Sequence, residues 1–457
     1  MSASLGAELA ALLDSERVLC PVPADSPYNS DTAGAWRGLR GSADAVVLPE
    51  RAEEVAAVIE LCVRKGLPLV PRGGGSGVSG GACPTVGGIV CSLERMRSVL
   101  ALEPGLWRMR VGAGLLTSEV QRLANENGLL FPPDPGAAEQ SQIGGNVATD
   151  AGGPHAFKYG STRNWVTGLE VVIPPGQVLQ LGGDNRKDVA GYALHHLIAG
   201  SEGTLGVITA VTLRLIPRPE QALSLVAFLR DRAAGCEAVL TVLGSGILAA
   251  TIEVIDGEAL RQIAGAYPGE VPEGSGFALL CEVDGGIEQT RCDRDELARA
   301  LAEDAIRVDL HDVQEPLRRW RAGVSGAVAA VYGGKVSEDV VVPPKHLKEL
   351  LDGFDEHATA AGLQSCAWGH GGDGNIHATV MLDPEDATAL KAAEQVMGAL
   401  FELAIQLGGS ISGEHGLGWV KRSALGLQYP PQALALQRRV KQAFDQSGVM
   451  NPDKKLP

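Results

Sequence analysis

Apolar residues recur with helix and strand periods along most of this chain. In residues 43–72, "ADAVVLPERAEEVAAVIELCVRKGLPLVPR", two short apolar runs flank an amphipathic stretch, which predicts a strand, a helix and a second strand. The apolar positions of the predicted helix have helical spacing, at Val55, Val58, Ile59 and Cys62. Gly66 follows where a carboxyl-terminal cap belongs, because glycine adopts the left-handed conformation without strain.

Comparable patterns predict elements up to about residue 217. "GGIVCSLERM" and "GLWRMRVGAG" indicate strands, and "LTSEVQRLANENG" indicates a helix with Thr117 or Ser118 as its amino-terminal cap. "VTGLEVVIPPGQVLQL" predicts a hairpin around a Pro-Pro-Gly turn. "LHHLIAGSEGTLGVITAVTLRL" predicts a short helix, a glycine turn and a strand. Between them, residues 131–165 are rich in Gly and Pro, and loops of such length are usually functional.

The pattern changes near Pro217 and Pro219. Strands and amphipathic helices then alternate to about residue 405, which indicates a second, α+β domain, and "PQALALQRRVKQAFDQSGVMNPDKKLP" predicts a helix and a tail. The amino-terminal residues show a helical apolar face and no early Lys or Arg, so they are typical of neither a secretory signal nor a transit peptide. That face consists of Leu5, Leu9, Leu12 and Leu13. The sequence has no run of 18 apolar residues, so we expect no transmembrane segment.

Composition narrows the class of protein. With 457 residues, two or three domains are expected, and the net charge of −16 without a basic cluster makes nucleic acid an unsuitable partner. The eight cysteines form no C-x-x-C pair, which argues against a Cys-ligated zinc or an iron–sulfur cluster within the chain and fits reduced thiols in the cytoplasm. The 59 glycines are the anomaly, because many are clustered as they are where backbone approaches a ligand.

The first glycine cluster lies in "PRGGGSGVSGG". Gly75, Gly77 and Gly80 match G-x-G-x-x-G, but the dinucleotide fold requires a helix directly after this loop, and "GACPTVGGIVCSL" reads as a strand. We therefore reject a Rossmann site. Consecutive glycines still let several amide groups converge on one anion such as a pyrophosphate, while an ordinary glycine-rich turn is the alternative.

Two further glycine motifs follow, "SQIGGNVATDAGG" and "GSEGTLGVIT". In the first, paired glycines and Asn146 offer backbone donors and a side-chain amide to a flat polar ring. Three such motifs within one domain suggest one long ligand that passes all of them.

These motifs, in this order over residues 41–218, resemble the flavoenzymes of the vanillyl-alcohol oxidase type with a PCMH-type FAD-binding domain. The resemblance implies that the first loop holds the FAD pyrophosphate through Arg72, Gly73, Gly74, Gly75, Ser76 and Gly77. It implies further FAD contacts from Ser141, Gly144, Gly145, Asn146, Glu202, Gly203, Gly206 and Ile208. The first loop contains serines and no His, so we expect non-covalent FAD. Ala193 in "GYAL" departs from the Gly-Tyr-Asp-Leu that is common in this family.

A second kind of motif is "WGHGGDGNIHATVM". The residues "GGDGN" have turn chemistry, so His370 is expected to end one strand and His377 to begin the next beside it. His377 and Thr379 then share one face of their strand, and the apolar residues Ile376, Ala378 and Val380 share the other. A third ligand is available in "GGSISGEHGLG", and two His with one carboxylate suit a catalytic divalent metal, whereas a lone core histidine is the alternative reading.

"GHGGDGNIH" followed by "SGEHGLG" resembles the D-lactate, glycolate and D-2-hydroxyglutarate dehydrogenase branch of this superfamily. The resemblance implies a divalent metal, zinc or manganese, on His370, His377 and Glu414, with His415 as the catalytic base. It also implies a substrate carboxylate bound by Arg321 and Lys335. Ser325 is expected nearby, Thr379 stands where some relatives have Asn, and Asn451 in the tail is expected to return towards the flavin.

The sequence thus predicts an α+β protein with four parts: an amino-terminal helical segment (1–40), a PCMH-type FAD-binding domain of two α+β subdomains (41–218), a substrate or cap domain with the metal site (219–440), and a carboxyl-terminal tail (441–457). The implied activity is FAD-dependent oxidation of a small D-2-hydroxy acid to the 2-keto acid, with metal polarisation of the substrate and hydride transfer to flavin N5. The implied electron acceptor is a cytochrome, a quinone or an electron-transfer flavoprotein.

Two alternatives remain open from the sequence. The chain is equally compatible with the flavin subunit of a multi-subunit glycolate oxidase that has an iron–sulfur partner. A metal-dependent hydrolase would use the His, His and Glu but would leave the glycine motifs unexplained. We expect a cytoplasmic location, with peripheral attachment to the inner membrane and a homodimer as open options.

Overall fold

The computed structural model describes residues 2–457, which form two compact units. Of the described residues, unit 1 comprises 2–152, 161–218 and 414–457, and unit 2 comprises 153–160 and 219–413. Compactness describes packing and does not test which segments fold alone, so the division at residues 40, 218 and 440 stays a prediction. None of the helices in residues 2–457 has the length and apolar character that are needed to cross a membrane.

Unit 1 begins with a four-stranded sheet in the order β1 (Val18–Leu19), β2 (Ala45–Val47), β4 (Ile89–Ser92), β3 (Leu69–Arg72). Strands β2, β4 and β3 are parallel, and α3 (Ala52–Lys65) connects β2 to β3. The predicted strand, helix and strand are therefore confirmed, and Gly66 caps α3 with a φ of 66°.

The second sheet of unit 1 is antiparallel. Its order is β5 (Val99–Glu103), β6 (Arg108–Gly112), β10 (Val207–Arg214), β8 (Val166–Ile173), β9 (Gln177–Gly182), which confirms the predicted hairpin of β8 and β9. A small pair, β7 (Leu129–Leu130) and β11 (Ile216–Pro217), lies apart from it. The predicted cap of α4 (Thr117–Glu126) is wrong: Leu116 is the cap and makes no side-chain hydrogen bond, because Thr117 lies inside the helix and binds Ser141 instead.

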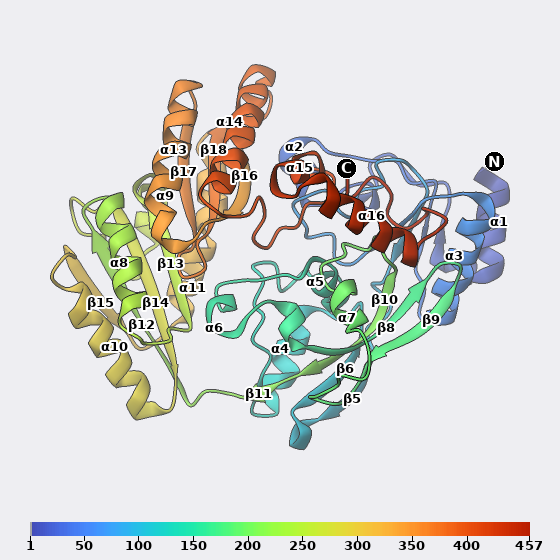
Figure 1. The fold of residues 1–457 in the computed structure, drawn as a ribbon, viewed down its shortest axis with the longest axis horizontal. Coiled ribbons are helices and arrows are strands. Elements are labelled where there is room, and N and C mark those ends of the chain that lie inside the picture. The colour runs from blue at the N-terminus through green and yellow to red at the C-terminus, as the bar shows by residue number, and fades with distance from the viewer. Residues whose placement is uncertain (1) are drawn as a thin grey trace. The chain divides into compact units, whose positions relative to one another are not determined.

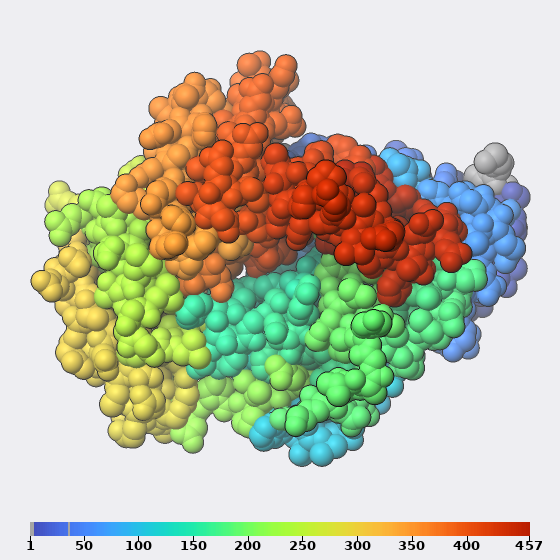
Figure 2. All heavy atoms as spheres, in the orientation of Figure 1, coloured from blue at the N-terminus to red at the C-terminus, as the bar shows by residue number. Residues whose placement is uncertain are grey.

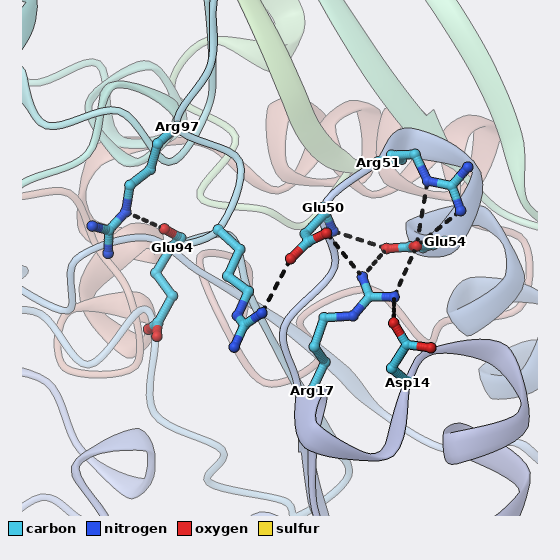
Figure 3. A network of polar contacts seen from close by, with 8 residues as sticks. Asp14, Arg17, Glu50, Arg51, Glu54, Glu94 and Arg97 are labelled. Atoms are coloured by element: carbon cyan, nitrogen blue, oxygen red, sulfur yellow. Dashed lines mark hydrogen bonds and ion pairs between the residues drawn. The ribbon is translucent and has the colours of Figure 1, made fainter.

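The amino-terminal segment is attached to unit 1 by a buried polar network. Helix α1 (Ser2–Leu12) buries Leu5 and Leu9, as its apolar face predicts. The Arg17 guanidinium, after α1, donates to both carboxylate oxygens of Glu54 on α3, at 2.7 and 3.2 Å. Figure 3 shows that Asp14, Glu50 and Arg51 join this network. Both side chains of the central pair are less than 10 % exposed, so this ion pair is part of the core.

The carboxyl-terminal segment returns to the core of unit 1. After α16 (Pro431–Phe444), Leu69 of β3 donates to Val449, and Asn451 donates to Leu69 in turn. Lys441 on α16 also donates to the carbonyl of Thr204. Figure 2 shows this dark red segment at the surface, next to the green residues of the same unit. The remaining helices of unit 1 are α2 (Thr32–Arg37), α5 (Ile143–Thr149), α7 (Leu194–Ile198) and α15 (Leu425–Gln428).

Unit 2 is built on one antiparallel sheet of seven strands. The order is β15 (Arg307–His311), β12 (Gln221–Leu229), β14 (Phe277–Gly285), β13 (Thr251–Asp256), β17 (Gln364–His370), β18 (Asn375–Leu382), β16 (Gly334–Val341). The helices on one face are α8 (Arg232–Gly244), α10 (Ile287–Leu301), α13 (Leu347–Ala360) and α14 (Ala387–Gln406). Helices α13 and α14 lie side by side, as Figure 1 shows. The short α6 (Ala156–Tyr159) also belongs to this unit.

The other face of this sheet carries the candidate chemistry. Helices α9 (Gly257–Ile263), α11 (Glu315–Ala322) and α12 (Val324–Ala330) pack there in an apolar cluster that includes Trp368 of β17. Directly paired residues of an antiparallel sheet point to the same face. Trp368 pairs with His377, and His370 pairs with Glu253. This face therefore carries buried polar side chains as well as an apolar core.

Candidate functional site

The first glycine loop has the properties of an anion cradle. It follows β3 in unit 1, and the amide groups of residues 73–77 donate no hydrogen bond to another described residue. A Cβ on Gly74 would lie 1.9 Å from the Gln140 carbonyl oxygen, so only glycine fits there. The strand β4 follows this loop, which confirms the reason for rejecting a Rossmann site. Consecutive unpaired amides on a tight turn suit a pyrophosphate.

Arg72 lies at the base of this loop and is buried. Its Nη1 donates to the Ser30 carbonyl over 2.7 Å, and its guanidinium lies 5.7 Å from the ring centre of Tyr28. A Cβ on Gly75 would lie 2.1 Å from Nη2 of Arg72, so the side chain fills the inside of the turn. In this structure Arg72 supports the loop that the sequence assigns to the pyrophosphate.

The second glycine motif forms the short helix α5 next to this loop. A Cβ on Gly73 would lie 3.4 Å from Cα of Gly145, so the two motifs pack closely. Asn146 Nδ2 donates to Thr117 Oγ1 over 2.6 Å, and Thr117 Oγ1 lies 2.8 Å from Ser141 Oγ. The expected cofactor residues Ser141, Gly144, Gly145 and Asn146 thus lie on one segment, fixed through Thr117.

The third motif contacts the carboxyl-terminal part of unit 1. Glu202 accepts hydrogen bonds from the amides of Leu417 and Gly418, at 3.1 and 2.6 Å, and from Lys455 Nζ at 3.0 Å. Asn451 Nδ2 donates to the Glu202 carbonyl over 2.8 Å. The Glu202 carboxylate is therefore engaged by protein groups. Of the other expected cofactor residues here, Gly203 has a φ of 71°, Gly206 packs on Val171, and Ile208 is buried in β10.

Three buried polar atoms of these motifs fit a bound polar group. Gln142 Oε1, Ser201 Oγ and Asn451 Oδ1 have no hydrogen-bond partner among the described residues. Buried polar atoms are nearly always paired, so such atoms need a ligand or water. Gln142, Ser201 and Asn451 belong to the second motif, the third motif and the expected flavin-facing tail. Their positions fit FAD as the occupant.

The two histidines of unit 2 come together as their spacing predicts. His370 ends β17, His377 lies in β18, and residues 371–374 form the turn between them. Their ring centres are 5.4 Å apart with planes at 85°. The alternation along β18 is also confirmed, although both faces of the strand are buried. The prediction that these histidines meet at a strand–turn–strand is thus confirmed.

Glu414 completes a set of metal-ligand atoms. Single ligand atoms of His370, His377 and Glu414 all lie within 4.8 Å of one another. Glu414 directly follows Gly413, whose amide donates to Asp339 Oδ2 over 2.6 Å. Two imidazoles and one carboxylate form a donor set that suits a divalent ion and leaves open coordination positions. The arrangement fits the expected metal centre.

A buried carboxylate links this cluster to Arg321. Glu253 on β13 is 1 % exposed, and its Oε1 lies 2.5 Å from Nδ1 of His370. Its Oε2 accepts from Nε of Arg321 over 2.6 Å. Burial opposes ionisation of Glu253, but Arg321 and His370 outweigh that effect and keep the pKa of its carboxyl below the usual value. Glu253 is therefore a charged residue in the core of unit 2.

Lys335 on β16 is also buried on this face. Its Nζ donates to Ser325 Oγ over 2.6 Å and lies 4.8 Å from the ring centre of Trp368. Burial lowers the pKa of Lys335 to about 8. Thr379 is fully buried, and its Oγ1 lies 2.7 Å from Ser337 Oγ. The structure thus brings Lys335 to Ser325 and Arg321 to His370 within unit 2.

His415 is half-buried and lies in unit 1, directly after Glu414. Ser79 Oγ, from the end of the first glycine loop, donates to the His415 carbonyl over 3.1 Å. The amides of Trp419 and Val420 donate to the Ser79 carbonyl. Since Glu202 holds residues 417 and 418, the loop that carries His415 is fixed by residues near two glycine motifs.

Sequence reasoning missed Glu253 and Asp339. Each is one of two acidic residues inside a buried strand, at "TIEVID" with Asp256 and at "GKVSEDVV" with Glu338. An acidic residue within a strand that is otherwise buried is rare unless it is paired. That was the one available signal, but their partners are distant in sequence.

Comparison with known proteins agrees with this picture of a flavoprotein. Residues 43–182 match the model "FAD binding domain", and residues 218–455 match "FAD linked oxidases, C-terminal domain". The chain therefore belongs to the FAD-linked oxidase family and is an FAD-linked oxidoreductase. Membership of this family favours an oxidoreductase over the alternative of a metal-dependent hydrolase.

Similar proteins cover nearly the whole chain. The glycolate oxidase subunit GlcD of Bacillus subtilis is 34% identical over 90% of this chain and 88% of its own length. The D-lactate dehydrogenases of Anaerostipes hadrus and Archaeoglobus fulgidus are 34% and 35% identical, over 93% and 90% of this chain and over 92% and 90% of their own lengths.

Solved structures show the same fold. p-Cresol methylhydroxylase aligns with a TM-score of 0.80 at 17% identity, over 99% of this chain and 96% of that one. The 4-ethylphenol oxidase of Gulosibacter chungangensis aligns with a TM-score of 0.79 at 17% identity, over 99% and 97%. The predicted α+β class with a PCMH-type FAD-binding fold is confirmed.

Proposed function

We propose that this enzyme uses FAD and a divalent metal ion, zinc or manganese, to oxidise the CH–OH group of a small D-2-hydroxy acid to the 2-keto acid. The observation that carries the proposal is the convergence of His370, His377 and Glu414, next to the Arg321 that Glu253 holds. The names of the relatives support the substrate class, because they include glycolate oxidase and D-lactate dehydrogenase.

The chain supplies two cations for the carboxylate of such a substrate. Arg321 is fixed through its Nε, so its two Nη groups remain for a carboxylate in the bidentate geometry that guanidinium favours. Lys335 is a buried ammonium whose desolvation makes an anionic partner favourable. Ser325 orients Lys335, and Thr379 with Ser337 offers a further polar contact. A small acid is favoured because Lys335 and Thr379 are buried and the Arg321 side chain is only 12% exposed.

Oxidation of the alcohol removes two electrons and two protons. Bound FAD would supply the acceptor for the Cα hydrogen with both electrons, as a hydride, and a bound divalent ion would supply a Lewis acid that lowers the pKa of the hydroxyl. His415 takes the hydroxyl proton as general base, next in sequence to the ligand Glu414. The bonds from Ser79 to the carbonyl of His415 and from Glu202 to the following amides hold this base in place. Non-covalent FAD is expected, because the loop holds no histidine.

Turnover with an artificial electron acceptor tests the proposal. Purified protein would be assayed with D-lactate, glycolate and D-2-hydroxyglutarate, and with L-lactate as the enantiomeric control. We expect turnover with at least one of the first three and at least about 100-fold less with L-lactate. Absence of turnover with all three acids, in protein that retains FAD and metal, would contradict the substrate class.

A second candidate is the flavin subunit of a larger oxidase. It is favoured because the Bacillus subtilis and Escherichia coli relatives are named as subunits of a glycolate oxidase. The partner would hold the iron–sulfur relay, because the eight cysteines of this chain form no C-x-x-C pair that would suit a cluster. Affinity purification from the native host, followed by iron analysis, separates the cases: stoichiometric iron and a second polypeptide support the subunit, and a single active polypeptide supports the stand-alone dehydrogenase.

A further inference from the structure

We propose that Glu253 is the positioning residue that orients the candidate metal ligand His370 and the candidate substrate-binding residue Arg321 at the same time. The proposal rests on the function proposed above. Glu253 lies directly opposite His370 in the β13–β17 register and is buried. Its two carboxylate oxygens contact different partners. Oε1 lies 2.5 Å from Nδ1 of His370, and Oε2 lies 2.6 Å from Nε of Arg321.

The donor pattern fixes the histidine. Arginine only donates hydrogen bonds, so Oε2 of Glu253 accepts from it. A carboxylate that faces a guanidinium is ionised and also accepts at Oε1, which requires the proton of His370 on Nδ1. The lone pair of His370 is then on Nε2, the atom through which this side chain would bind a metal. Carboxylates in this position raise the basicity of ligand histidines and fix their ring orientation.

The same contact orients Arg321. Only Nε of Arg321 donates to Glu253, and the Nη groups donate to no other described residue. A guanidinium held at Nε is a preorganised fork, so fewer rotamers are lost when a carboxylate binds. Glu253 thus sets the distance between a cation for the substrate carboxylate and a ligand of the metal that faces the hydroxyl.

Only a carboxylate satisfies both partners. Glutamine has the same shape but one acceptor oxygen, so in Glu253→Gln one of the two donors faces an NH₂ group. Aspartate keeps both oxygens but is one methylene shorter. Glu253→Gln is therefore a sharp test, because it removes one acceptor and little volume.

The chain offers a matched control on the neighbouring strand. Glu282 on β14 points to the same face of the sheet and is 4 % exposed. It also binds one histidine and one arginine: its Oε1 lies 3.1 Å from His155 Nε2 and 2.7 Å from Arg318 Nη2. None of these three residues belongs to the candidate metal or substrate site. Glu282→Gln therefore reports the general cost of changing a buried carboxylate.

The test measures Mn²⁺ affinity of metal-free, FAD-loaded protein by calorimetry and electron paramagnetic resonance. We expect Glu253→Gln to weaken Mn²⁺ binding by about 10–100-fold and to raise KM for the hydroxy acid, with FAD content unchanged. Glu282→Gln should stay within about threefold of wild type in both quantities. Equal Mn²⁺ affinity in wild type and Glu253→Gln would overturn the proposal, as would equal losses in the two variants.

A second substitution separates positioning from general damage. In Glu253→Gln with Arg321→Met, the single amide oxygen no longer has a competing donor and can turn to His370. We expect the double variant to bind Mn²⁺ more tightly than Glu253→Gln alone, while KM stays high. An affinity equal to or below that of the single variant would contradict the shared-acceptor geometry.

The tautomer of His370 tests the proposal without any change to Glu253. Long-range ¹⁵N–¹H spectra of ¹⁵N-histidine wild-type protein, assigned by Asn substitution of His370, should show the Nδ1–H form. The Nε2–H form would overturn the proposal even if Glu253→Gln does not fold. Failure of the function is distinguishable, because wild-type protein would then bind neither Mn²⁺ nor Zn²⁺.

Discussion

The two compact units differ in the kind of group that they offer to a ligand. In unit 1 the candidate ligand groups are backbone amides of a glycine loop, residues 73–77, and its side chains mostly hold that backbone. In unit 2 they are side chains of a sheet face, His370 and His377, supported by buried carboxylates such as Glu253 and Asp339. A backbone site depends on the absence of side chains, whereas a side-chain site depends on exact partners. The two sites should therefore fail in different ways.

Removal of the metal should give the largest effect and leave unit 1 intact. Dialysis against a chelator is expected to lower kcat/KM by about 1000-fold or more, because Lewis-acid stabilisation contributes several kcal/mol. FAD absorbance should not change. Metal analysis and add-back of Mn²⁺ or Zn²⁺ check the effect, and full activity in metal-free protein would contradict the metal centre.

His415→Ala tests the base. We expect kcat to fall by about 100- to 10,000-fold, the usual contribution of a general base, with FAD and metal still bound. The control is His196→Ala, an exposed histidine of the same unit. Stopped-flow measurement of flavin reduction gives the rate, and a wild-type rate in His415→Ala would remove this assignment.

Gly74→Ala should damage unit 1 alone. The new methyl group would meet the Gln140 carbonyl at 1.9 Å, so the loop has to move and FAD affinity should fall at least about 100-fold. Gly81→Ala is the matched control, because a Cβ there has no atom within 4 Å. Both variants should bind Mn²⁺ normally. Similar FAD affinity in the two variants would contradict the backbone cradle.

Arg17→Met tests the scaffold of unit 1 rather than its site. Glu54 would keep Arg51 and the Glu50 amide, so we expect a loss of about 2 kcal/mol in unfolding free energy, below the usual cost of breaking a buried pair. Burial opposes ionisation of Glu54, but Arg17 lowers its pKa to about 2. Because the pKa of Glu54 is lower in the folded state than in the unfolded state, its ionisation stabilises the fold at pH values above the unfolded pKa of 4.5. This stabilisation is lost as the pH falls towards 2.

Urea unfolding at pH 7 and pH 3 checks this prediction. The difference between wild type and Arg17→Met should narrow at pH 3. Arg51→Met, whose side chain is 69 % exposed, is the control and should change stability by less than about 0.5 kcal/mol. Equal effects of both substitutions would show that burial does not decide the strength of this network.

The smallest expected effect is the pH dependence of KM, which we expect from the titration of Lys335 in unit 2. Because burial lowers the pKa of Lys335 to about 8, its ammonium is lost above that pH and KM should rise about tenfold per pH unit. Cys366 on β17 faces Lys335, but burial raises the pKa of its thiol, so it stays neutral in this range. Lys335→Met should have a high KM that does not change between pH 7 and 9. A persisting rise in that variant would assign the titration to another group.

The same difference between the units decides what the sequence could predict. The glycine motifs and the strand–turn–strand around His370 and His377 are local, so short segments sufficed for them. The Glu253 link spans 117 residues to His370 and 68 to Arg321, and only the sheet register brings these residues together. The prediction of the amino-terminal cap of α4 is wrong for a similar reason, because Thr117 binds Ser141 and Asn146, which lie far from it in sequence. The role of Glu202 also depends on distant residues, at 417, 418 and 455.

The most direct measurement is the anaerobic visible spectrum of purified protein before and after addition of D-lactate, glycolate or D-2-hydroxyglutarate, with and without metal. We expect a flavin spectrum that one of these acids bleaches in metal-loaded protein and leaves oxidised in chelator-treated protein. A flavin that bleaches equally fast without metal, or that none of the acids bleaches, would contradict this expectation.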